Sequence, residues 1–398
     1  MIPEAGLGKH DTNVMPLRGV RVVALEHAVA GPLCTRHLAD LGAVVTKIEG
    51  PSGDFARTYD STVRGESAYF VWLNRGKQSV VLDLERTRDR RILESMLSDA
   101  DVFVHNQGPG VVDRMGFGWP SVHRRWPQMI TCAISGYGRD GPYRDRKAFD
   151  LLLQAESGLM SITGSPEQPA RVGISIADIS AGMYALSSIL AALLLRARTN
   201  EGTLIDISML ECITEWMMAP VYHQLYGAGP PARTGPRHNM IVPYGPYRVG
   251  DGSHVILVAQ SPDHWGRLCA QVLLRPKLED DPRFATNELR LRNRGQLEAG
   301  IEDALASETY ATVLGRLDSA GLPTATMRDL AGLVSHPQLR ARERWVEIDT
   351  EGGRVTGLRP PFNLEGMPSL ASAVPALDQH GPVLRRAVEA SWTGDEHG

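Results

Sequence analysis

Hydrophobic and polar positions along the first 210 residues predict short buried strands that alternate with helices. Runs of apolar and β-branched residues, VRVVAL at Val20–Leu25 and AVVTKI at Ala43–Ile48, are typical of strands covered on both faces. Between them, apolar residues recur at helical spacing over Leu33–Leu41, and Gly42 follows as a C-terminal cap. The same patterns predict further strands at 79–84, 102–105, 129–135 and 203–209, and helices at 87–98, from about 111, and from about 179 to 198. Strands that alternate with helices predict an α/β fold with a parallel sheet.

The pattern changes after about residue 225. Residues 226–252 are rich in Gly and Pro and too long for an ordinary connection, which indicates a linker or a functional loop. A predicted strand at 255–259 and charged helices at 287–305 and 309–320 follow. We therefore divide the chain into a large α/β domain, a linker with a small α+β domain, and a return segment that completes the large domain, at residues 1–225, 226–335 and 336–398.

Composition narrows the class of protein. Of the 398 residues, 42% are hydrophobic and 22% are charged, which is average for a soluble globular protein and excludes a disordered chain. The 42 Lys and Arg residues are interleaved with 46 Asp and Glu residues, giving a net charge of −4. No phosphate-tracking basic face is indicated, so we expect no nucleic-acid partner.

The longest apolar stretch, Ala181–Leu195, is shorter than the roughly 20 residues needed to cross a bilayer. Asp178 and Arg196 flank it closely, so we expect a core helix and no membrane partner. The first fifteen residues lack the apolar run of a secretory signal. We therefore expect a cytoplasmic protein.

The four cysteines are far apart and form no CxxC pair: Cys34, Cys132, Cys212 and Cys269. This spacing predicts buried thiols in a reducing compartment rather than disulfides or a metal site. Motifs that bind phosphate or carry hydrolytic chemistry (GxxxxGK[ST], GxGxxG after the first strand, HExxH and GxSxG) are absent from the sequence. The residues alone indicate a cytosolic α/β enzyme with a ligand at the carboxyl ends of its strands.

Several segments, in the same order along nearly the whole chain, resemble the family III coenzyme A transferases, also called the CaiB/BaiF family. They are LRGVRVVALEHAVAGPLCTRHLADLGAVVTKIEGPSGDFAR (17–57), LNRGKQSVVLDL (73–84), DVFVHNQGPGVVDRMGFG (101–118), ISGYGRDGPYRDRKAFD (134–150), SGLMSITG (157–164) and GISIADISAGMYA (173–185). HNMIVPYGPY at 238–247 looks like a loop of the succinyl-CoA:glutarate-type members. The resemblance implies a Rossmann-like large domain, a smaller α+β domain and an interlocked homodimer.

By this resemblance, Asp178 is the nucleophile, because the family places an aspartate before a long helix of small residues. A carboxylate can attack a thioester to form a mixed anhydride and release CoA thiolate. The thiolate then attacks the aspartyl carbonyl, giving an aspartyl-CoA thioester from which an acceptor acid takes CoA. The alternative is that Asp178 only caps the helix that follows.

The resemblance also implies a CoA site. It places Val29 and Ala30 under the pantetheine, Leu82 and Asp83 beside the adenosine, Asn106, Gln107 and Arg114 along the nucleotide, and Lys147, Ala148, Phe149 and Asp150 beside the thioester. Acyl-CoA is then a substrate, and we expect no permanently bound cofactor and no metal. Val29 replaces a glutamine of the formyl-CoA transferases, and Gly50 replaces a basic residue. These departures argue against a formyl or oxalate substrate and remove one phosphate contact.

The racemase branch of the family removes and returns an α-proton with a histidine and an aspartate. Phe149 occupies the position of that histidine and cannot exchange a proton, which favours transfer, although His27 or His238 could substitute. We expect His238 near the acyl group and His27 at a strand end. A non-catalytic acyl-CoA-binding protein is a further alternative.

The loop likeness favours dicarboxylates of four to six carbons, such as succinate or glutarate. A distal carboxylate needs a cation, which Arg57 or Arg237 could supply, although either could equally lie on the surface. A carnitine-type acid would need an aromatic cage, and 6% aromatic residues without a local cluster argue against one. We predict a CoA transferase that moves CoA from succinyl-CoA, or another dicarboxylyl-CoA, to a small carboxylic acid.

Overall fold

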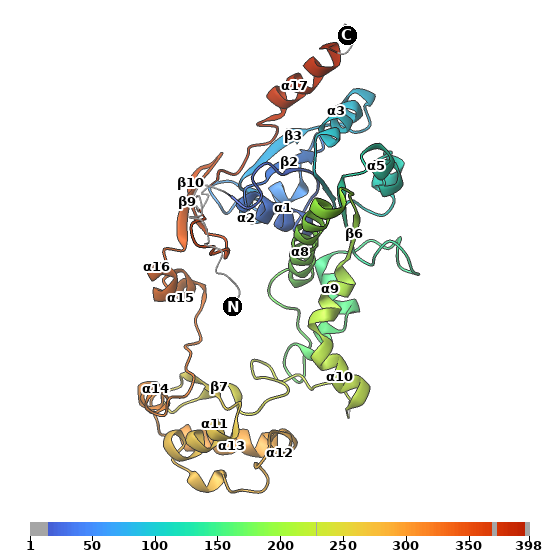
Figure 1. The fold of residues 1–398 in the computed structure, drawn as a ribbon. Helices are drawn as coiled ribbons and strands as arrows, with labels where there is room; N and C mark the ends of the chain where they lie inside the picture. The colour runs from blue at the N-terminus through green and yellow to red at the C-terminus, as the bar shows by residue number, and fades with distance from the viewer. Residues whose placement is uncertain (1–14, 228, 368–371, 395–398) are drawn as a thin grey trace, which may run out of the picture. The chain divides into compact units, whose positions relative to one another are not determined.

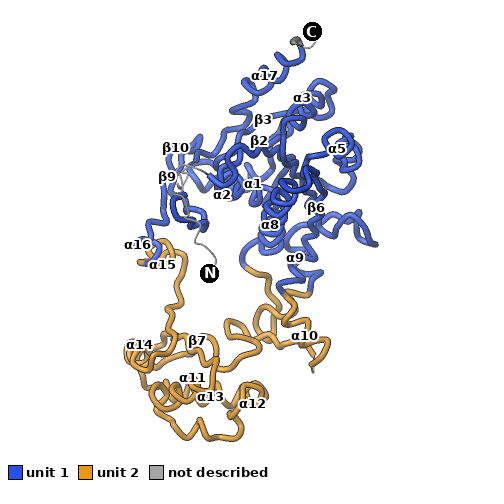
Figure 2. Tube along the Cα trace, viewed as in Figure 1, with its two compact units in different colours: residues 1–157, 173–216, 338–398 blue, residues 158–172, 217–337 orange. Residues whose placement is uncertain are grey.

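A computed structural model describes residues 15–227, 229–367 and 372–394 (Figure 1). Residues 1–14 lie outside the described residues. The prediction that the first fifteen residues contain no secretory signal therefore falls almost entirely outside them. The chain forms two compact units (Figure 2). Unit 1 comprises residues 1–157, 173–216 and 338–398, and unit 2 comprises residues 158–172 and 217–337. The sequence-based division at residues 225 and 335 stays a prediction; these units add residues 158–172 to the second part.

Unit 1 is built on a parallel sheet. Among the described residues its six strands are β1 (Arg21–Leu25), β2 (Val44–Glu49), β3 (Lys77–Val81), β4 (Val102–His105), β5 (Ile130–Ser135) and β6 (Leu204–Ser208). Their order is β3-β2-β1-β4-β5-β6, and every neighbouring pair is parallel. The predicted α/β fold is confirmed. The order reverses between β1 and β4, which leaves a crevice at the carboxyl ends of these two strands.

Helices cover both faces of this sheet, as the strand–helix alternation predicts. On one face, α1 (Ala30–Asp40) contacts β1, β2 and β4, α8 (Ile176–Thr199) contacts β5 and β6, and α6 (Asp150–Glu156) and α9 (Met209–Trp216) pack against α8. On the other face, α3 (Thr87–Ser98), α5 (Trp119–Arg125) and α17 (Gly381–Gly394) share a hydrophobic core with the alternate residues of the strands. The short α4 (Val111–Arg114) joins β4 to α5.

Helix α8 is, among the described residues, the one helix long and apolar enough to cross a membrane, with a mean hydropathy of 1.6. It packs between α1, α9 and the sheet, which fits the predicted core helix. Small residues allow this packing: a Cβ added at Gly182 would lie 2.8 Å from the carbonyl oxygen of Ala30. The helix begins at Ile176, three residues before the predicted start.

The return segment belongs to unit 1. It contains α16 (Pro337–Ala341, at the boundary of the units), the antiparallel hairpin of β9 (Trp345–Thr350) and β10 (Gly353–Leu358), and α17. Ile348 and Val355 of the hairpin form a small core with Phe70 and Val71 of α2 (Ala68–Asn74). A short 3-10 helix, η1 (Phe55–Thr58), precedes α2.

Unit 2 combines a β-hairpin with short helices, in keeping with the predicted α+β character. Its elements are α7 (Leu159–Ile162), α10 (Met218–Tyr226), β7 (Tyr244–Arg248), β8 (His254–Val258), α11 (Pro262–Arg267), the π-helix η2 (Leu268–Val272), the 3-10 helix η3 (Pro276–Leu278), α12 (Asn287–Arg292), α13 (Arg294–Leu305), α14 (Tyr310–Ser319) and α15 (Leu330–Val334). Strand β7 lies inside the Gly/Pro-rich segment, and Val242 and Tyr247 there are fully buried. Part of that segment, around residues 242–249, therefore belongs to the core of unit 2.

Candidate active site

Two adjoining cavities open at the carboxyl ends of the strands of unit 1. The larger, of about 840 Å³, lies between the β1–α1 turn, the end of β4, the loop before α6 and the first turn of α8. The second, of about 710 Å³, lies over the ends of β2 and β3. His27 and Gln107 border both cavities. The cavities thus occupy the switch point of the sheet, where open α/β sheets bind their ligands.

The β1–α1 turn forms one wall of the larger cavity. The N–H of His27 donates to Asn106 Oδ1 at 2.9 Å, and Asn106 Nδ2 donates to the carbonyl oxygen of His27 at 2.8 Å. Val29, the N-cap of α1, makes no side-chain cap, and the first turn holds no acidic residue. The free N–H groups at the start of α1 therefore favour an anion in this part of the cavity.

Asp178 lies in the first turn of α8 and lines the same cavity. Within the described part of the chain, no group donates a hydrogen bond to its carboxylate and no cation pairs with it. Burial raises the pKa of Asp178 to about 7, and the nearby carboxylate of Asp150 adds to the shift. Because the free energy of a buried, unpaired carboxylate is high, this group is well suited to react with an electrophile.

The cap of α8 is supplied by another residue. Ser175 is the N-cap position, and the N–H of Ala177 donates to Asp150 Oδ1 at 2.8 Å. Asp150, which we predicted beside the thioester, thus fixes the turn that carries Asp178. The alternative interpretation of Asp178 as the helix cap finds no support in this geometry.

An aromatic wall that the sequence analysis missed lines the cavity beside Asp178. Tyr59 and Tyr69 are both lining residues, and their ring centroids are 5.8 Å apart. Phe55 packs on Tyr59 at 5.8 Å, and Trp72 packs on Tyr69 at 6.1 Å. The expectation that the aromatic residues form no local cluster was wrong. The i,i+4 spacing of Phe55 and Tyr59 and the i,i+3 spacing of Tyr69 and Trp72 were the available signal.

Tyr59 also responds to Asp178 electrostatically. Burial raises the pKa of Tyr59 to about 12, and the carboxylates of Asp54 and Asp178 contribute in that order. The phenol is therefore neutral over the physiological range and keeps its O–H as a donor. Tyr69 also lines the cavity, and its hydroxyl lies 3.4 Å from Ser175 Oγ.

The structure brings the predicted CoA-binding residues together at the two cavities. The larger cavity is lined by His27, Val29, Ala30, Asn106, Gln107, Arg114, Lys147, Ala148, Phe149, Asp150 and Asp178. The second is lined by Leu82 and Asp83, together with His27 and Gln107. Arg114 and Lys147 are exposed and, among the described residues, have no ion-pair partner. Their individual roles stay predictions.

The two arginines predicted for a distal carboxylate are both held by acidic side chains. Arg57 donates from Nε and Nη2 to the two carboxylate oxygens of Glu49, each at 2.8 Å, and lies 3.7 Å over the ring of Phe70. Arg57 lines neither cavity. In unit 2, Arg237 pairs with Glu298 at 2.8 Å and with Glu302. Neither guanidinium is free to bind substrate in this arrangement.

His238 belongs to unit 2, where it stacks on Tyr244 with the ring centroids 5.1 Å apart. Its Nδ1 accepts from the N–H of Met240 at 3.0 Å. Its predicted place near the acyl group stays a prediction. His27, in contrast, lies at the end of β1 as expected, and burial lowers the pKa of its imidazole despite the nearby carboxylate of Asp54.

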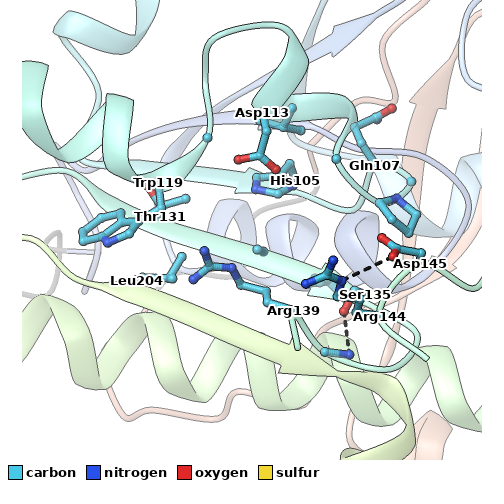
Figure 3. Close-up of a pocket in the computed structure, with 18 residues that line it drawn as sticks. His105, Gln107, Asp113, Trp119, Thr131, Ser135, Arg139, Arg144, Asp145 and Leu204 are labelled. Carbon is cyan, nitrogen blue, oxygen red and sulfur yellow. Dashed lines mark hydrogen bonds and ion pairs between the residues drawn. The ribbon is translucent and has the colours of Figure 1, made fainter. Parts of the chain in front are cut away.

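A third, smaller cavity of about 240 Å³ lies over β4, β5 and β6 (Figure 3). His105, Asp113, Thr131 and Arg139 line it together with Gln107. Burial lowers the pKa of His105 to about 4, so its ring is neutral. Across residues 15–227, 229–367 and 372–394, no cluster of three or more His, Cys, Asp or Glu side chains has the arrangement of a metal site. The four cysteines are free and buried, as predicted.

The family model for CoA-transferase family III matches residues 17–381. The chain is 35% identical to an acetyl-CoA:oxalate CoA-transferase of Acetobacter aceti, over 94% of this chain and 96% of that protein. It is 34% identical to a succinyl-CoA:glutarate CoA-transferase of Mus musculus, over 82% and 75%. It is 33% identical to a succinyl-CoA:mesaconate CoA-transferase of Haloarcula hispanica, over 92% and 94%.

Solved structures agree with these relatives. A CaiB/BaiF family protein from Brucella suis matches with a TM-score of 0.81 and 33% identity, covering 94% of this chain and 99% of that one. A Mycobacterium tuberculosis protein described as hypothetical matches with a TM-score of 0.82 and 29% identity, over 93% and 99%. The resemblance stated from the sequence is confirmed: the chain belongs to CoA-transferase family III and is a CoA transferase.

Proposed function

We propose that unit 1 moves CoA from an acyl-CoA, such as succinyl-CoA or another dicarboxylyl-CoA, to a free carboxylic acid, with Asp178 as covalent nucleophile. One observation carries the proposal: the carboxylate of Asp178 is unpaired within the described chain and lines a cavity large enough for a thioester arm. Burial raises its pKa to about 7, so the ionised form is available at neutral pH while remaining poorly solvated.

The steps balance without any other reagent. Asp178 attacks the thioester carbonyl, the C–S bond breaks, and an acyl-aspartyl anhydride and CoA thiolate form. The thiolate attacks the aspartyl carbonyl, giving aspartyl-CoA thioester and releasing the donor acid. The acceptor carboxylate then attacks this thioester, its C–S bond breaks, and an acceptor–aspartyl anhydride and CoA thiolate form. The thiolate attacks the acceptor carbonyl of this anhydride, which gives the new acyl-CoA and releases the Asp178 carboxylate. Ala30 at the start of α1 and Tyr59 line the same cavity as Asp178, and we assign to the α1 amides and the Tyr59 hydroxyl the stabilisation of the oxyanions of these steps.

The second cavity suits the nucleotide half of CoA. Leu82 is buried and apolar and offers a surface for the adenine, while Gln107 connects this cavity to the larger one. Arg114 and Lys147 line the larger cavity as unpaired cations and suit the phosphates. Acyl-CoA would then lie across the carboxyl ends of β1 and β4.

The relatives indicate the chemical class of the acceptor acid but not which acid it is. Their names include oxalate, glutarate and mesaconate, all dicarboxylates. A valine at position 29, in place of the glutamine of the formyl-CoA transferases, argues against oxalate as the acceptor. The relative from Acetobacter aceti is nonetheless named as an oxalate CoA-transferase. The aromatic wall of Tyr59 and Tyr69 also gives a reason to include carnitine.

The test is transfer of CoA from radiolabelled succinyl-CoA to a panel of free acids, including glutarate, mesaconate, oxalate and carnitine. We expect new acyl-CoA to form with one or more dicarboxylates at the expense of succinyl-CoA. Binding of succinyl-CoA without turnover across the panel would leave only a binding protein and contradict the proposal.

A racemase or isomerase is the second candidate, because His27 lines the same cavity as Asp178 and its lowered pKa keeps it neutral and able to accept a proton. Phe149 nonetheless occupies the position of the racemase histidine. Incubation of 2-methylacyl-CoA in D₂O without any acid separates the two reactions. Deuterium at the α-carbon would favour the second candidate, and its absence favours transfer.

We further propose an interlocked homodimer in the cytoplasm. Both units expose apolar side chains that a second copy can cover, including Leu194 and Leu195 on α8, Leu225 and Tyr226 on α10, and Leu330 on α15. Interlocked chains separate only by unfolding, so sedimentation should show a dimer even at nanomolar concentration. A folded monomer after dilution would contradict the interlocked arrangement.

A further inference from the structure

The carboxylate of Asp54 connects two walls of the larger cavity. Asp54 is buried, and its Oδ1 accepts from the N–H of Ala28 at 3.2 Å and from the N–H of Ala56 at 2.9 Å. Ala28 belongs to the β1–α1 turn, which lines the cavity. Ala56 belongs to η1, which Asp54 caps and which leads directly to the cavity residue Tyr59. A single oxygen atom therefore holds the start of both walls.

The β1–α1 turn needs a restraint because one of its residues has an unfavourable backbone conformation. Ala28 has a φ of 60°, in the left-handed region. For a residue with a Cβ this conformation costs about 1–2 kcal/mol, so an unrestrained Ala28 would leave it. Asn106 fixes the preceding residue through both backbone groups of His27. On Ala28 itself, the bond to Asp54 is the side-chain restraint that the described residues provide.

Lys47 fixes the other oxygen of Asp54. Its ammonium is fully buried and donates to Asp54 Oδ2 at 2.8 Å and to the carbonyl oxygen of Glu26 at 3.3 Å. Burial alone would lower the pKa of Lys47, but the carboxylates of Glu26, Asp54 and Glu49 outweigh it and raise the pKa. The N–H of Asp54 also donates to Glu49 Oε2 at 2.9 Å. The carboxylate of Asp54 thus accepts from Ala28, Ala56 and Lys47, while Glu49 holds its backbone.

We propose that Asp54 is a positioning residue for CoA transfer: by holding Ala28 in the left-handed conformation, it aims the N-terminal amides of α1 and the His27–Ala30 wall into the cavity that contains Asp178. Asp54 borders the second cavity but not the larger one, so its effect on the chemical step would pass through its bond to Ala28. The inference rests on the proposed function of Asp178. It assigns to the buried ion pair of Lys47 and Asp54 a role in turnover beyond stability.

The test uses Asp54→Asn, Ala28→Gly and the double variant in the full chain, with succinyl-CoA and the best acceptor of the panel. Asparagine keeps the shape of the side chain, but one of its two ends is an NH₂ donor. Depending on the orientation of the amide, this donor faces either the ammonium of Lys47 or the N–H of Ala28, and one of the two hydrogen bonds is lost. We expect Asp54→Asn to lower kcat about tenfold or more with a smaller change in KM, since the amides of the turn act mainly on the developing oxyanion. Glycine adopts positive φ without the steric cost. Ala28→Gly in the Asp54→Asn background should therefore recover kcat at least threefold.

Asp40→Asn is the matched control. Asp40 is equally buried and pairs with Arg75 at 3.0 Å, but it touches neither the turn nor the cavity. It should lower thermal stability without a comparable loss of kcat, and Ala28→Gly should not compensate for it. If Asp54→Asn does not fold, Ala28→Val, which disfavours positive φ while leaving the ion pair intact, should reproduce the loss of kcat.

Hydrogen exchange at residues 27–30 without substrate gives a readout independent of turnover. We expect exchange at Ala28 to be at least tenfold faster in Asp54→Asn than in the wild type and unchanged in Asp40→Asn. A folded Asp54→Asn variant with kcat within twofold of the wild type, or with wild-type exchange at Ala28, would overturn the inference. A wild type that transfers CoA to no acid would instead refute the proposed function and leave the exchange result standing.

Discussion

Unit 1 contains two groups of carboxylates, and cations are fixed beside only one of them. In the buried network that borders the second cavity, every acid has a basic partner: Glu26, Glu49 and Asp54 pair with Lys47, Lys77 and Arg57. In the larger cavity, Asp178 lies near Asp150 with no cation bonded to it among the described residues. The first group is buried and neutralised, whereas Asp178 and Asp150 are half-buried in the cavity lining and not neutralised.

The pKa values show what this difference does. Burial alone would raise the pKa of Glu49, but its hydrogen bond from Arg57 and the charge of Lys47 lower it to about 2. Nothing offsets burial at Asp178, and its pKa rises to about 7. A carboxylate is thus an inert scaffold where a cation is fixed beside it and a reactive group where none is. Charge pairing therefore sets the direction of the pKa shift in each region.

The largest effect is expected from removing the charge of Asp178. Asp178→Asn keeps the shape of the side chain but cannot form an anhydride, so transfer from succinyl-CoA should fall by several orders of magnitude. Circular dichroism and CoA binding should remain as in the wild type. Activity within tenfold of the wild type would place the nucleophile elsewhere.

Breaking the paired region should instead damage stability. Glu26→Gln leaves the buried ammonium of Lys77 without a counter-charge, removes one of the two carboxylates beside Lys47, and should lower the free energy of unfolding by about 3–5 kcal/mol. The control is Glu288→Gln, whose pair with Arg292 is exposed and should contribute under about 1 kcal/mol. Equal losses for the two variants in urea titration would mean that the buried pairs are no more important than surface pairs.

The unpaired region should show the opposite dependence of stability on pH. Because the folded-state pKa of Asp178 lies above its usual value of 3.8, protonation favours the folded state. That contribution is complete below about pH 4 and is lost as pH rises through about 7. Asp178→Asn should therefore exceed the wild type in stability by about 4 kcal/mol at pH 8, with little difference at pH 4. A constant difference between these pH values, measured by urea titration, would contradict an unpaired, buried Asp178.

The smallest effect is expected at the cavity rim, where cations are present but unpaired. Lys147→Ala should raise KM for succinyl-CoA about three- to tenfold with little change in kcat, and salt should shrink the difference. Arg248→Ala, an exposed cation of unit 2 that lines none of the three cavities, is the control. A loss of kcat without a change in KM would mean that Lys147 takes part in the chemical steps.

Patterning predicted most of the sheet and the helices beside it. Helix α3 matches its predicted bounds, and β4 does too, because local apolar runs and caps suffice to define them. Strand β3 begins two residues earlier than predicted, because its first residues, Lys77 and Gln78, are polar and do not match the pattern of a buried strand. Lys77 can be buried there because Glu26, 51 residues away in the sequence, neutralises it. Strand β7 was missed because Gly and Pro dominate the segment that contains it.

The site shows the same limit. The resemblance supplied Asp178 and the predicted lining residues, while the clamp of Ala28, Asp54 and Lys47 depends on contacts over 26 and 7 residues that no local pattern reveals. Arg57 illustrates the reverse error. Its sequence context suggested a free cation, but the partner that occupies it, Glu49, is recognisable as such only once η1 folds back on β2.

The central claim, that the unpaired Asp178 forms a covalent bond with substrate, is tested most directly by trapping. The wild type is incubated with hydroxylamine in the presence and absence of succinyl-CoA, and the peptide that contains residue 178 is analysed by mass spectrometry. We predict an aspartyl hydroxamate at Asp178, with loss of activity, only when succinyl-CoA is present, and none at the paired Asp54. An unmodified Asp178 in enzyme that is turning over succinyl-CoA would contradict the account.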